Sequence, residues 1–324
     1  MDVEELNGND WRNTPCALCN AEPVYLYHPA RSPGPVVRCS NCGLVYVGSL
    51  QDTQAIITSG PVTSNLAPDI LHSGNLQDLD GCWELATLAE KESELPALRR
   101  NARRALDRLS CLTDKLGRLL DFGCGGGFFL AEAAKQGWKT VGLEPLAGHA
   151  VYARAKFHLN IVTDVLHDDT FPPNFFDVIT AFQVFEHLLS PVHDLSLLAS
   201  CLKPGGLILI EVPNIDTWGV KLLKSKHRHF VRDHLYFFSA KTLDKLVKIC
   251  GLEPLETYYP VHWMTPRHLI RYFCTIVGIH LSQMPKLFGS LIIPMSLHDI
   301  VAILAQKPAS AVERYANARQ QADH

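Results

Sequence analysis

The sequence predicts an α/β fold with a doubly wound parallel sheet, preceded by a small cysteine-rich module. From Gly117 onward, apolar strand-like runs alternate with helix-like runs, which is the pattern of consecutive βα units. The first strand-to-helix turn, within LLDFGCGGGFFLAEAA, packs four glycines into five positions. Two Cys-x2-Cys pairs near the start of the chain stand apart from this alternation. A chain of 324 residues with 47% hydrophobic content can bury one large core and a small additional module.

The cysteine-rich module carries Cys16 and Cys19 as one pair and Cys39 and Cys42 as the other, with nineteen residues between the pairs. Two such turns can bring four thiolates together as a tetrahedral Zn²⁺ site. Four cysteine ligands leave no open coordination position, so the metal would be structural. Because the surrounding short strands offer little apolar surface, the metal would also supply folding energy. We expect a zinc ribbon over residues 1–48; a redox pair is the alternative, but it would not need the second Cys-x2-Cys.

The charge and the start of the chain limit the function classes. A net charge of −3 gives no overall field for gathering RNA, so nucleic acid is not an expected partner. The first twenty residues are acidic and polar and lack the apolar run of a secretory signal, so we expect a cytoplasmic protein. The remaining cysteines occur singly and are expected to be reduced and buried: Cys82, Cys111, Cys124, Cys201, Cys250 and Cys274.

Between the module and the glycine-rich turn lie a polar stretch and a helical one. Residues 49–80 are rich in Ser, Thr, Asn, Asp, Gly and Pro, which predicts a linker or a lid. The next segment has helical spacing that is broken at Pro96. It carries a run of arginines, which is a solvated helix face or, alternatively, part of a lid or a phosphate-facing helix: Arg99, Arg100, Arg103, Arg104 and Arg108.

The βα alternation then continues to the end of the predicted domain. Strand-like runs lie at 118–123, 138–145, 160–164, 175–182, 205–213, about 252–258 and 297–307. Helix-like runs lie at 128–137, 147–157, 192–202 and 239–251, the last between Ser239 as N-cap and Gly251 as C-cap. In such a sheet the ligand binds at the carboxyl ends of the strands.

The glycine-rich turn reads Asp121-x-Gly123-x-Gly125-x-Gly127. A dinucleotide-binding fold would place a small residue at position 128, where this chain has Phe128. A carboxylate two residues before the first glycine would repel a diphosphate and attract an ammonium group. The turn therefore predicts a cationic amino-acid nucleoside as ligand.

With these motifs, the chain resembles the class I S-adenosylmethionine-dependent methyltransferases, whose first motif is this acid-x-Gly-x-Gly-x-Gly turn. The resemblance covers roughly residues 80 to 306. It implies a Rossmann-like, seven-stranded methyltransferase sheet over residues 81–306, S-adenosylmethionine as cofactor, and a C-terminal tail at 307–324. A Pro-Gly-Gly turn that feeds the fifth strand completes the pattern.

The resemblance also implies positions that contact the cofactor. Glu144 ends the second strand, where the family has an acid that accepts both ribose hydroxyls. Asp164 or Val165 would lie beside the adenine, although an ordinary loop explains these two residues equally well. Phe182 and Gln183, at the end of the fourth strand, would border the methionine end of the cofactor.

Two His–acid neighbours follow. Glu186-His187, just after the fourth strand, recurs in this superfamily as a cap-positioning or acceptor-contacting pair, or as a structural one. In ubiquinone-type O-methyltransferases another acid stands three residues before the Glu, and metal binding has been proposed there. Gln183 replaces that acid here, which weakens the case for a second metal.

The second neighbour pair is Asp233-His234, in HFVRDHLYFFS. It resembles the substrate-side stretch of zinc-ribbon sugar methyltransferases, which implies Asp233 as the acid and His234 as a general base. Substrate binding without proton transfer, or a structural role, is the alternative. Val231 and Arg232 replace a Tyr and a His of that family, so the acceptor differs.

Two insertions, at about 214–238 and 260–295, are expected to form the acceptor side. The second is apolar but is interrupted by charged residues and proline, which predicts an acceptor-covering helical segment and excludes a membrane span. A membrane-surface or dimer contact is its rival interpretation. The first insertion contains a basic run that is a solvated loop or suits a phosphate-bearing acceptor: Lys221, Lys224, Lys226, His227, Arg228, His229 and Arg232.

We therefore expect a methyltransferase that moves a methyl group from S-adenosylmethionine to an oxygen or carbon of a small molecule. A sugar, a lipid-linked metabolite or a polyketide-like metabolite would be the acceptor. One alternative is a ribosomal RNA methyltransferase whose zinc module reads RNA. The net charge, and the absence of an Asn-Pro-Pro-Tyr-type motif after the fourth strand, count against it. The other alternative is a non-catalytic scaffold that the cofactor merely stabilises.

Overall fold

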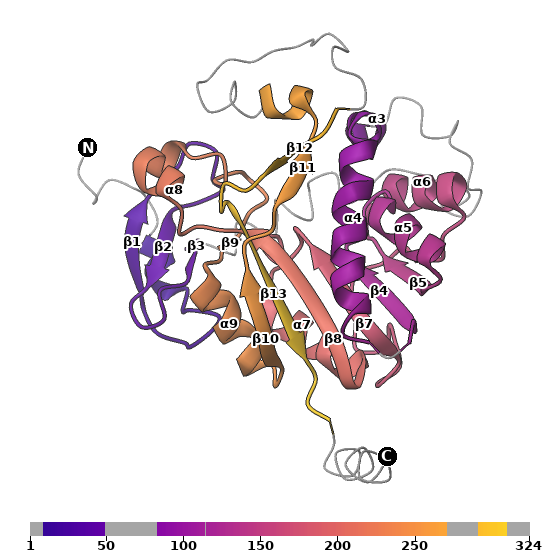
Figure 1. The fold of residues 1–324 in the computed structure, drawn as a ribbon. Helices are drawn as coiled ribbons and strands as arrows, with labels where there is room; N and C mark the ends of the chain where they lie inside the picture. Colours follow the sequence, from indigo (N-terminus) through magenta and orange to yellow (C-terminus); the bar gives the residue numbers. More distant parts are fainter. Residues whose placement is uncertain (1–8, 49–82, 114, 271–290, 310–324) are drawn as a thin grey trace.

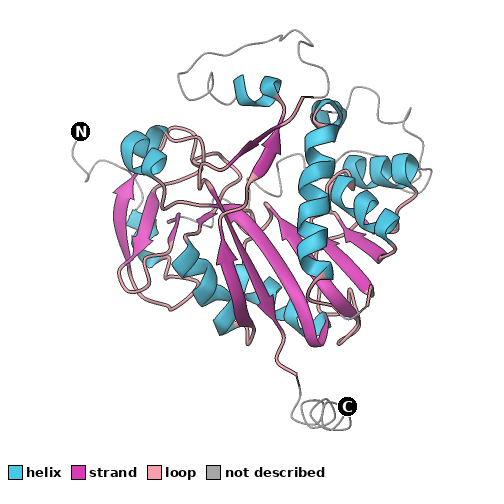
Figure 2. Ribbon diagram, in the orientation of Figure 1, coloured by secondary structure: helices cyan, strands magenta, loops and turns pink. Residues whose placement is uncertain are grey.

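Two β-sheets organise the part of the chain that the computed structural model describes: residues 9–48, 83–113, 115–270 and 291–309 (Figures 1 and 2). The larger sheet has seven strands and the smaller has four. The predicted linker or lid at 49–80, most of the predicted tail, Cys82, Cys274 and the centre of the second insertion lie outside the described residues.

The seven-stranded sheet has the order β10-β13-β8-β7-β4-β5-β6. Its strands are β4 (Arg118–Phe122), β5 (Lys139–Leu143), β6 (Ile161–Val162), β7 (Phe176–Phe182), β8 (Leu202–Pro213), β10 (Glu253–Tyr258) and β13 (Ile300–Gln306). The five strands from β8 to β6 pair in parallel. The prediction of a parallel sheet is wrong at the other end, because β13 runs antiparallel to both β8 and β10. The result is a mixed sheet with the seven strands that the family resemblance implies.

Alternate side chains of the central strands enter two separate cores, because successive residues of a strand point to opposite faces. In β4, Leu119 packs on one face and Leu120 on the other, and Val178 and Ile179 of β7 repeat this division. Helices cover both faces (Figure 1). On one face lie α4 (Leu95–Ser110), α5 (Phe128–Gln136) and α6 (Ala147–Phe157), and on the other lie α7 (Pro191–Cys201) and α9 (Ala240–Ile249).

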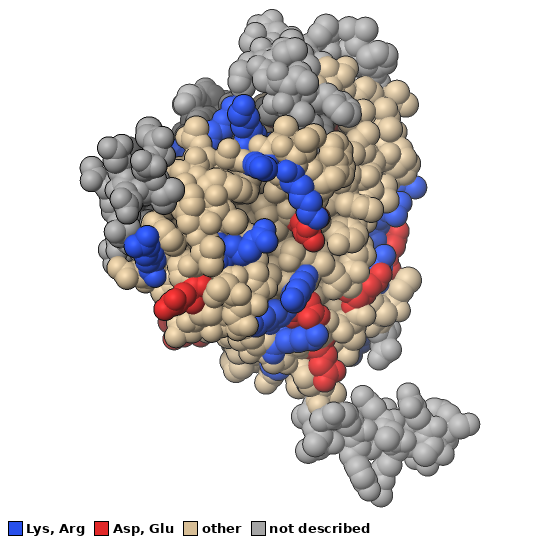
Figure 3. Space-filling view, turned by 90° about the vertical axis from the view of Figure 1, so that its left-hand side faces the viewer, with Lys and Arg blue, Asp and Glu red and all other residues tan. Residues whose placement is uncertain are grey.

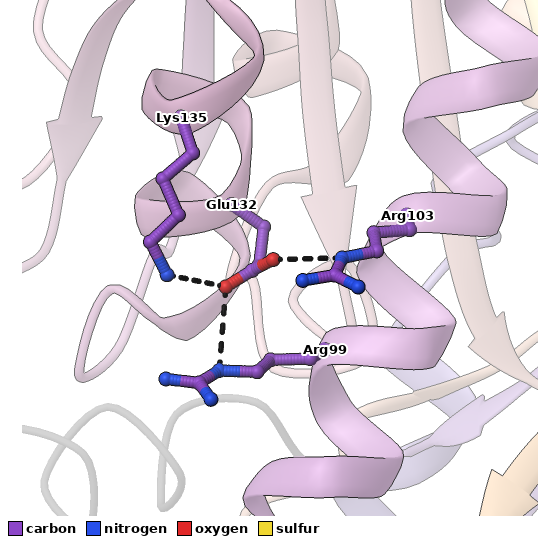
Figure 4. Close-up of polar contacts among 4 residues, drawn as sticks. All are labelled: Arg99, Arg103, Glu132 and Lys135. Carbon is purple, nitrogen blue, oxygen red and sulfur yellow. Dashed lines mark hydrogen bonds and ion pairs between the residues drawn. The ribbon is translucent and has the colours of Figure 1, made fainter.

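The predicted break at Pro96 is present: α3 (Trp83–Ser93) ends there and α4 begins. The arginine run of α4 divides between packing and the cavity described below. Figure 4 shows Arg99 and Arg103 of α4 meeting Glu132 of α5, with N···O distances of 3.4 and 3.0 Å, while Lys135 approaches from 2.6 Å. Burial would raise the pKa of Glu132, but these cations lower it. The cluster therefore holds α4 against α5.

The cysteine-rich module forms the four-stranded sheet, in the order β1-β2-β3-β9. The strands are β1 (Pro23–Tyr27), β2 (Val36–Cys39), β3 (Val45–Val47) and β9 (Tyr236–Phe237), and the 3-10 helix η2 (Asn9–Asn13) precedes them. The fourth strand thus comes from the predicted acceptor segment, almost two hundred residues later in the chain. Side chains of this sheet, including Tyr46, share a core with α7 and α9. The module is therefore part of the main body rather than a separate unit.

The first insertion also contributes α8 (Trp218–Leu223) and the 3-10 turn η4 (Lys224–Lys226), and the second contributes the strand pair β11 (His262–Met264) and β12 (Ile293–Met295). Asn101 of α4 fixes β11 in place through two hydrogen bonds with the backbone of Trp263, 3.0 and 2.7 Å long.

None of the described helices is long and apolar enough to cross a membrane. Among the single cysteines, Cys124 and Cys201 are buried, but the prediction is wrong for Cys111, which is exposed at the end of α4.

Candidate active site

A cavity of about 1,890 Å³ opens at the carboxyl ends of β4, β5, β7 and β8. Pockets for one small ligand typically hold roughly 300–1,000 Å³, so this cavity has room for two. It brings together nearly all of the predicted cofactor and acceptor residues, which come from distant parts of the chain. Those on its wall are Asp121, Gly123, Gly125, Glu144, Asp164, Val165, Phe182, Gln183, His187, Asp233 and His234.

The glycine-rich turn exposes its backbone to this cavity. Gly123 and Gly125 have φ values of +71° and +53°, which side chains rarely adopt. A Cβ at Gly125 would meet only the end of Lys91, at 3.7 Å, so a ligand can approach the backbone closely there. The N–H groups of Gly123 and Cys124 donate to the carbonyl of Leu143, at 2.8 and 3.2 Å. These N–H groups are therefore already used and do not form the phosphate cradle of a dinucleotide site.

Glu144 anchors the turn. One carboxylate oxygen accepts a 2.7 Å hydrogen bond from Gly125 N–H, and the other accepts a 2.9 Å bond from Leu146 N–H. The side chain is almost fully buried at the end of β5. A carboxylate can accept about four hydrogen bonds, so this side chain is suited to accept from ligand hydroxyls as well as from the turn.

Asp121 lies behind the turn, 3% exposed, and accepts a 2.7 Å hydrogen bond from the hydroxyl of Thr180. Burial, together with the negative charge of Glu144, raises its pKa to about 7, and the Thr180 hydroxyl opposes this shift. A buried carboxylate that has no cation close by among the described residues fits a ligand that brings an ammonium group.

Gly127 alone among the predicted cofactor residues is not on the cavity wall. It is the N-cap of α5, with φ +76°. A Cβ there would lie 2.6 Å from Leu159 Cδ1 and 3.0 Å from the Cβ of Ala153. The absence of a side chain at position 127 thus permits close packing of α5 against α6 and the segment after it.

The remaining cofactor-side predictions lie at the ends of β6 and β7. Asp164 and Val165 are exposed on the cavity rim. The ring of Phe182 packs 4.7 Å from that of Phe129. Gln183 has a left-handed backbone, φ +57°, and its N–H donates to Glu211 O at 2.8 Å. Such a conformation is costly for a residue other than glycine and is common at functional sites.

The two His–acid neighbours meet at the acceptor end, but their pairing differs from the one expected. Nδ1–H of His187 donates to the backbone carbonyl of Asp233 at 2.8 Å, and the Asp233 carboxylate lies 3.6 Å from the same nitrogen. The carboxylate expected to orient His234 therefore faces His187. The two imidazole rings lie edge to face, 4.8 Å apart.

Glu186 is buried and His234 is half-buried beside His187. Neither carboxyl oxygen of Glu186 has a hydrogen-bond partner among the described residues, and burial raises its pKa to about 8. Burial, and then the charge of His187, lower the pKa of His234 to about 4, so its ring is neutral near pH 7. One ligand atom from each of these three residues lies within 4.8 Å of the others, close enough to share a cation. In the sequence, Gln183 stands where ubiquinone-type enzymes have an acid, and this counted against a metal site. The fold nevertheless brings His234 to Glu186 and His187 as a third donor.

Sequence reasoning missed one charged pair on the cavity wall. Glu211, at the end of β8, lies 3.2 Å from Nε2 of His262 on β11. Burial would lower the pKa of His262, but the hydrogen bond and charge of Glu211 raise it. A lone acid within the apolar run LILIEVP is a signal that could have pointed to Glu211. No pattern in the sequence singled out His262.

The basic run of the first insertion is less basic than its composition suggests. His227 and His229 are buried, and burial lowers the pKa of both, so they are neutral. Arg228 forms an ion pair with Asp299. The lysines and Arg232 remain on the surface or on the cavity rim.

The four paired cysteines converge at one end of the four-stranded sheet. The Sγ atoms of Cys16 and Cys42 are 3.5 Å apart, those of Cys19 and Cys39 are 3.4 Å apart, and all four lie within 4.8 Å of one another. Tetrahedral zinc with Zn–S bonds of about 2.3 Å separates its sulphurs by about 3.8 Å, so this donor set fits a zinc ion. Backbone N–H groups point at two of the sulphurs, as they do around metal thiolates.

Comparisons with known proteins agree with this architecture. Residues 95–257 match a family model described as a methyltransferase domain. A ubiquinone biosynthesis O-methyltransferase of Aeromonas salmonicida is 28% identical over 164 residues, which are 45% of this chain and 68% of that protein. Its namesake from Vibrio cholerae is 28% identical over 223 residues, 66% of this chain and 81% of that protein. Its namesakes from Rhodopseudomonas palustris (strain TIE-1) and Bradyrhizobium sp. (strain ORS 278) are matched over 43% of their length.

Among solved structures, a SAM-dependent methyltransferase from Archaeoglobus fulgidus is 21% identical. The match covers 64% of this chain and 94% of that one, with a TM-score of 0.45.

Proposed function

The chain belongs to the family of methyltransferase domains and is an S-adenosylmethionine-dependent enzyme; we propose that it methylates a hydroxyl oxygen of a small molecule with a large apolar part. One observation carries the proposal. A single cavity joins the buried acids Asp121 and Glu144 at one end to His187 and its partner Asp233 at the other. Cofactor and acceptor would therefore meet in one enclosed space.

At the cofactor end, Glu144 would accept hydroxyl groups, and Asp121 would face the ammonium group. Gly123 and Gly125 would let the backbone approach, with Phe182 and Gln183 beside them. When bound, S-adenosylmethionine supplies an electrophilic methyl group on a positively charged sulphur. The protein's own contribution there is to hold the cofactor and exclude water.

At the acceptor end, we propose His187 as the general base in place of His234. Because Nδ1–H of His187 donates to Asp233, its Nε2 carries the lone pair that can take a hydroxyl proton. The Asp233 carboxylate, 3.6 Å away, would stabilise the imidazolium that forms. His234 is the weaker candidate, since its lowered pKa makes it a poor proton acceptor. It would instead pack against His187 and keep its ring in place.

The acceptor wall suits an apolar molecule with one polar end. Between His187 and the β11–β12 pair it is mostly apolar, formed by Leu188, Leu189, Val231, Tyr258, Val261, Met264 and Ile300. The relatives named for ubiquinone biosynthesis support a hydroxylated aromatic or lipid-linked acceptor over a sugar or polyketide-like one. Arg104 and Arg232 on the same wall would accommodate an anionic group on the acceptor.

The proposal is tested by incubating the enzyme with radiolabelled S-adenosylmethionine and an acceptor panel. The panel contains a catechol with a long alkyl chain, the same catechol without the chain, a nucleotide-linked sugar, and ribosomal RNA. We expect O-methylation of the long-chain catechol, with a lower KM than for the short one. Methylation of the sugar or the RNA alone would overturn the acceptor class, and no transfer to any of them would count against the proposal.

The cofactor end predicts a pH dependence. A ligand ammonium group prefers the ionised carboxylate of Asp121. Because the pKa of Asp121 is about 7, about a tenth of the molecules have this carboxylate ionised at pH 6 and about nine-tenths at pH 8. The affinity for S-adenosylhomocysteine should therefore rise about tenfold over this range. Titration calorimetry in buffers of different ionisation heats should also detect a released proton. Thr180→Val removes the hydroxyl that lowers this pKa, so its profile should move to higher pH; an unmoved profile would contradict the role of Asp121.

We further propose that the four cysteines bind one structural zinc ion. Cys39→Ser should reduce the zinc content from about one ion per chain to a small fraction, because the site loses a thiolate that two backbone N–H groups support. The unfolding temperature should fall by on the order of 10 °C. Cys111→Ser, at an exposed thiol, is the matched control and should change neither value. Full zinc content in Cys39→Ser, measured by atomic absorption, would refute the assignment.

A further inference from the structure

Helix α8 presents two large apolar side chains to solvent. Trp218 is 72% exposed and Leu222 is 70% exposed, and because they are four residues apart they lie on the same side of the helix. The opposite side packs inward through Val220, which joins Phe230 and Phe237 in a small core under the four-stranded sheet. We call the outward side the Trp218–Leu222 face.

Within the described part of the chain, this helix is held by its own cap and by the packing of its inner side. The side chain of Thr217 caps the helix by accepting a hydrogen bond from Val220 N–H at 3.2 Å. The Trp218–Leu222 face is therefore a stable feature of the folded chain. A Trp and a Leu exposed together on one small face are unusual on a soluble surface and indicate a surface that contacts an apolar environment.

Three lysines lie within α8 and the turn that follows it. Lys221, Lys224 and Lys226 are all exposed. Lys221 forms an exposed ion pair with Asp216 at 2.7 Å, which leaves the segment 216–226 with an excess of positive charge. Figure 3 views the molecule from the side on which α8 and the four-stranded sheet lie, and on the upper part of this surface the drawn charges are mainly Lys and Arg. Exposed apolar side chains with exposed lysines in the same short segment match the apolar interior and the anionic headgroups of a lipid bilayer.

Along the chain, the Trp218–Leu222 face comes shortly before residues that line the acceptor end of the cavity. The segment that follows α8 and η4 supplies Arg228, Arg232, Asp233 and His234 to the cavity wall. The Trp218–Leu222 face and this part of the acceptor wall thus belong to one insertion.

From these observations we infer that the Trp218–Leu222 face and Lys221, Lys224 and Lys226 form a docking surface for an anionic phospholipid bilayer. The charge pattern favours this occupant over others. A second copy of the chain would bring the same lysines into opposition. A nucleic acid would use the lysines but would leave Leu222 without an apolar contact. Membrane docking does not depend on which acceptor the enzyme methylates, because vesicle binding needs no turnover.

The test measures co-sedimentation of the full chain with vesicles of phosphatidylcholine alone and of phosphatidylcholine mixed with phosphatidylglycerol. We expect binding to the anionic vesicles only, weakening as salt is raised. The double variant Trp218→Ser, Leu222→Ser should lose at least about tenfold in partitioning. Lys224→Gln with Lys226→Gln should lose on the order of tenfold or more at low salt, at about fivefold for each lysine.

Matched controls are Leu112→Ser, an exposed leucine at the end of α4, and Lys139→Gln, an exposed lysine on β5. Neither should change vesicle binding. All variants should keep the wild-type affinity for S-adenosylhomocysteine, which shows that they fold. Equal binding of the wild type and the Trp218/Leu222 variant, or no binding to anionic vesicles, would overturn the inference. Self-association that depends on Trp218 in sedimentation velocity, without vesicle binding, would assign the face to a dimer instead.

Discussion

Glu144→Ala is expected to weaken the binding of S-adenosylhomocysteine by about 10²- to 10⁴-fold. The carboxylate accepts backbone hydrogen bonds from Gly125 and Leu146, and hydrogen bonds to a charged group contribute about 1.5–3 kcal/mol each. Without them the turn loses its connection to the end of β5, and the proposed acceptor for the ligand hydroxyls is also removed. Titration calorimetry on the purified variant measures the loss directly.

Glu144→Gln separates shape from charge. The amide keeps the size of the side chain and one carbonyl oxygen, but it cannot accept from both N–H groups and from ligand hydroxyls at once. Its affinity should fall between those of the wild type and Glu144→Ala. Wild-type affinity in Glu144→Ala, with the fold intact by circular dichroism, would remove Glu144 from the cofactor site.

His187→Ala should lower kcat for the methylated acceptor by about 10²- to 10⁴-fold, the range that a positioned general base contributes. Its affinity for S-adenosylhomocysteine should be unchanged, because the ring lies at the other end of the cavity from Glu144 and Asp121. Single-turnover kinetics with saturating cofactor isolates this step.

Two further variants give this prediction its contrast. Asp233→Asn keeps the backbone carbonyl that accepts from His187 Nδ1 and removes only the carboxylate charge, so its loss of kcat should be smaller than that of His187→Ala. His234→Ala removes the neighbouring ring without removing the proposed base. A larger loss of kcat in His234→Ala than in His187→Ala would return the base role to His234.

Local patterns predicted most of the sheet and the cofactor end. The alternation of strand-like and helix-like runs matches β4 to β8 and their helices, because each strand is buried on both faces and each helix has an apolar stripe. The glycine-rich turn and Glu144 belong to consecutive βα units, so proximity along the chain already places them together. Their cofactor roles remain predictions from family resemblance.

Long-range pairing is what the sequence could not reveal. A three-residue strand, β3, pairs with the two-residue strand β9, and neither is long enough to carry a periodic signal. For the same reason the sequence did not reveal that Asp233 approaches His187. Adjacency in the sequence suggested His234, whereas the turn before β9 directs the Asp233 backbone and carboxylate to His187. The Glu211–His262 pair likewise depends on where an insertion folds back over the cavity.

The antiparallel direction of β13 and the packing role of Gly127 have similar explanations. The direction of β13 depends on how the chain returns from the second insertion. An apolar run has the same pattern whether the strand is parallel or antiparallel to its neighbours. A glycine three positions after Cys124 fits the ligand motif, but the space it leaves is filled by Leu159 and Ala153 from elements further along the chain.

We propose above all that Asp121, behind the glycine-rich turn, makes the site select a cationic amino-acid nucleoside over a diphosphate. Titration calorimetry of the purified chain with S-adenosylhomocysteine and, separately, with NAD tests it most directly. We expect a saturable heat of binding with S-adenosylhomocysteine and no heat of binding with NAD at the same concentrations. Tight binding of NAD with no heat from S-adenosylhomocysteine would contradict it.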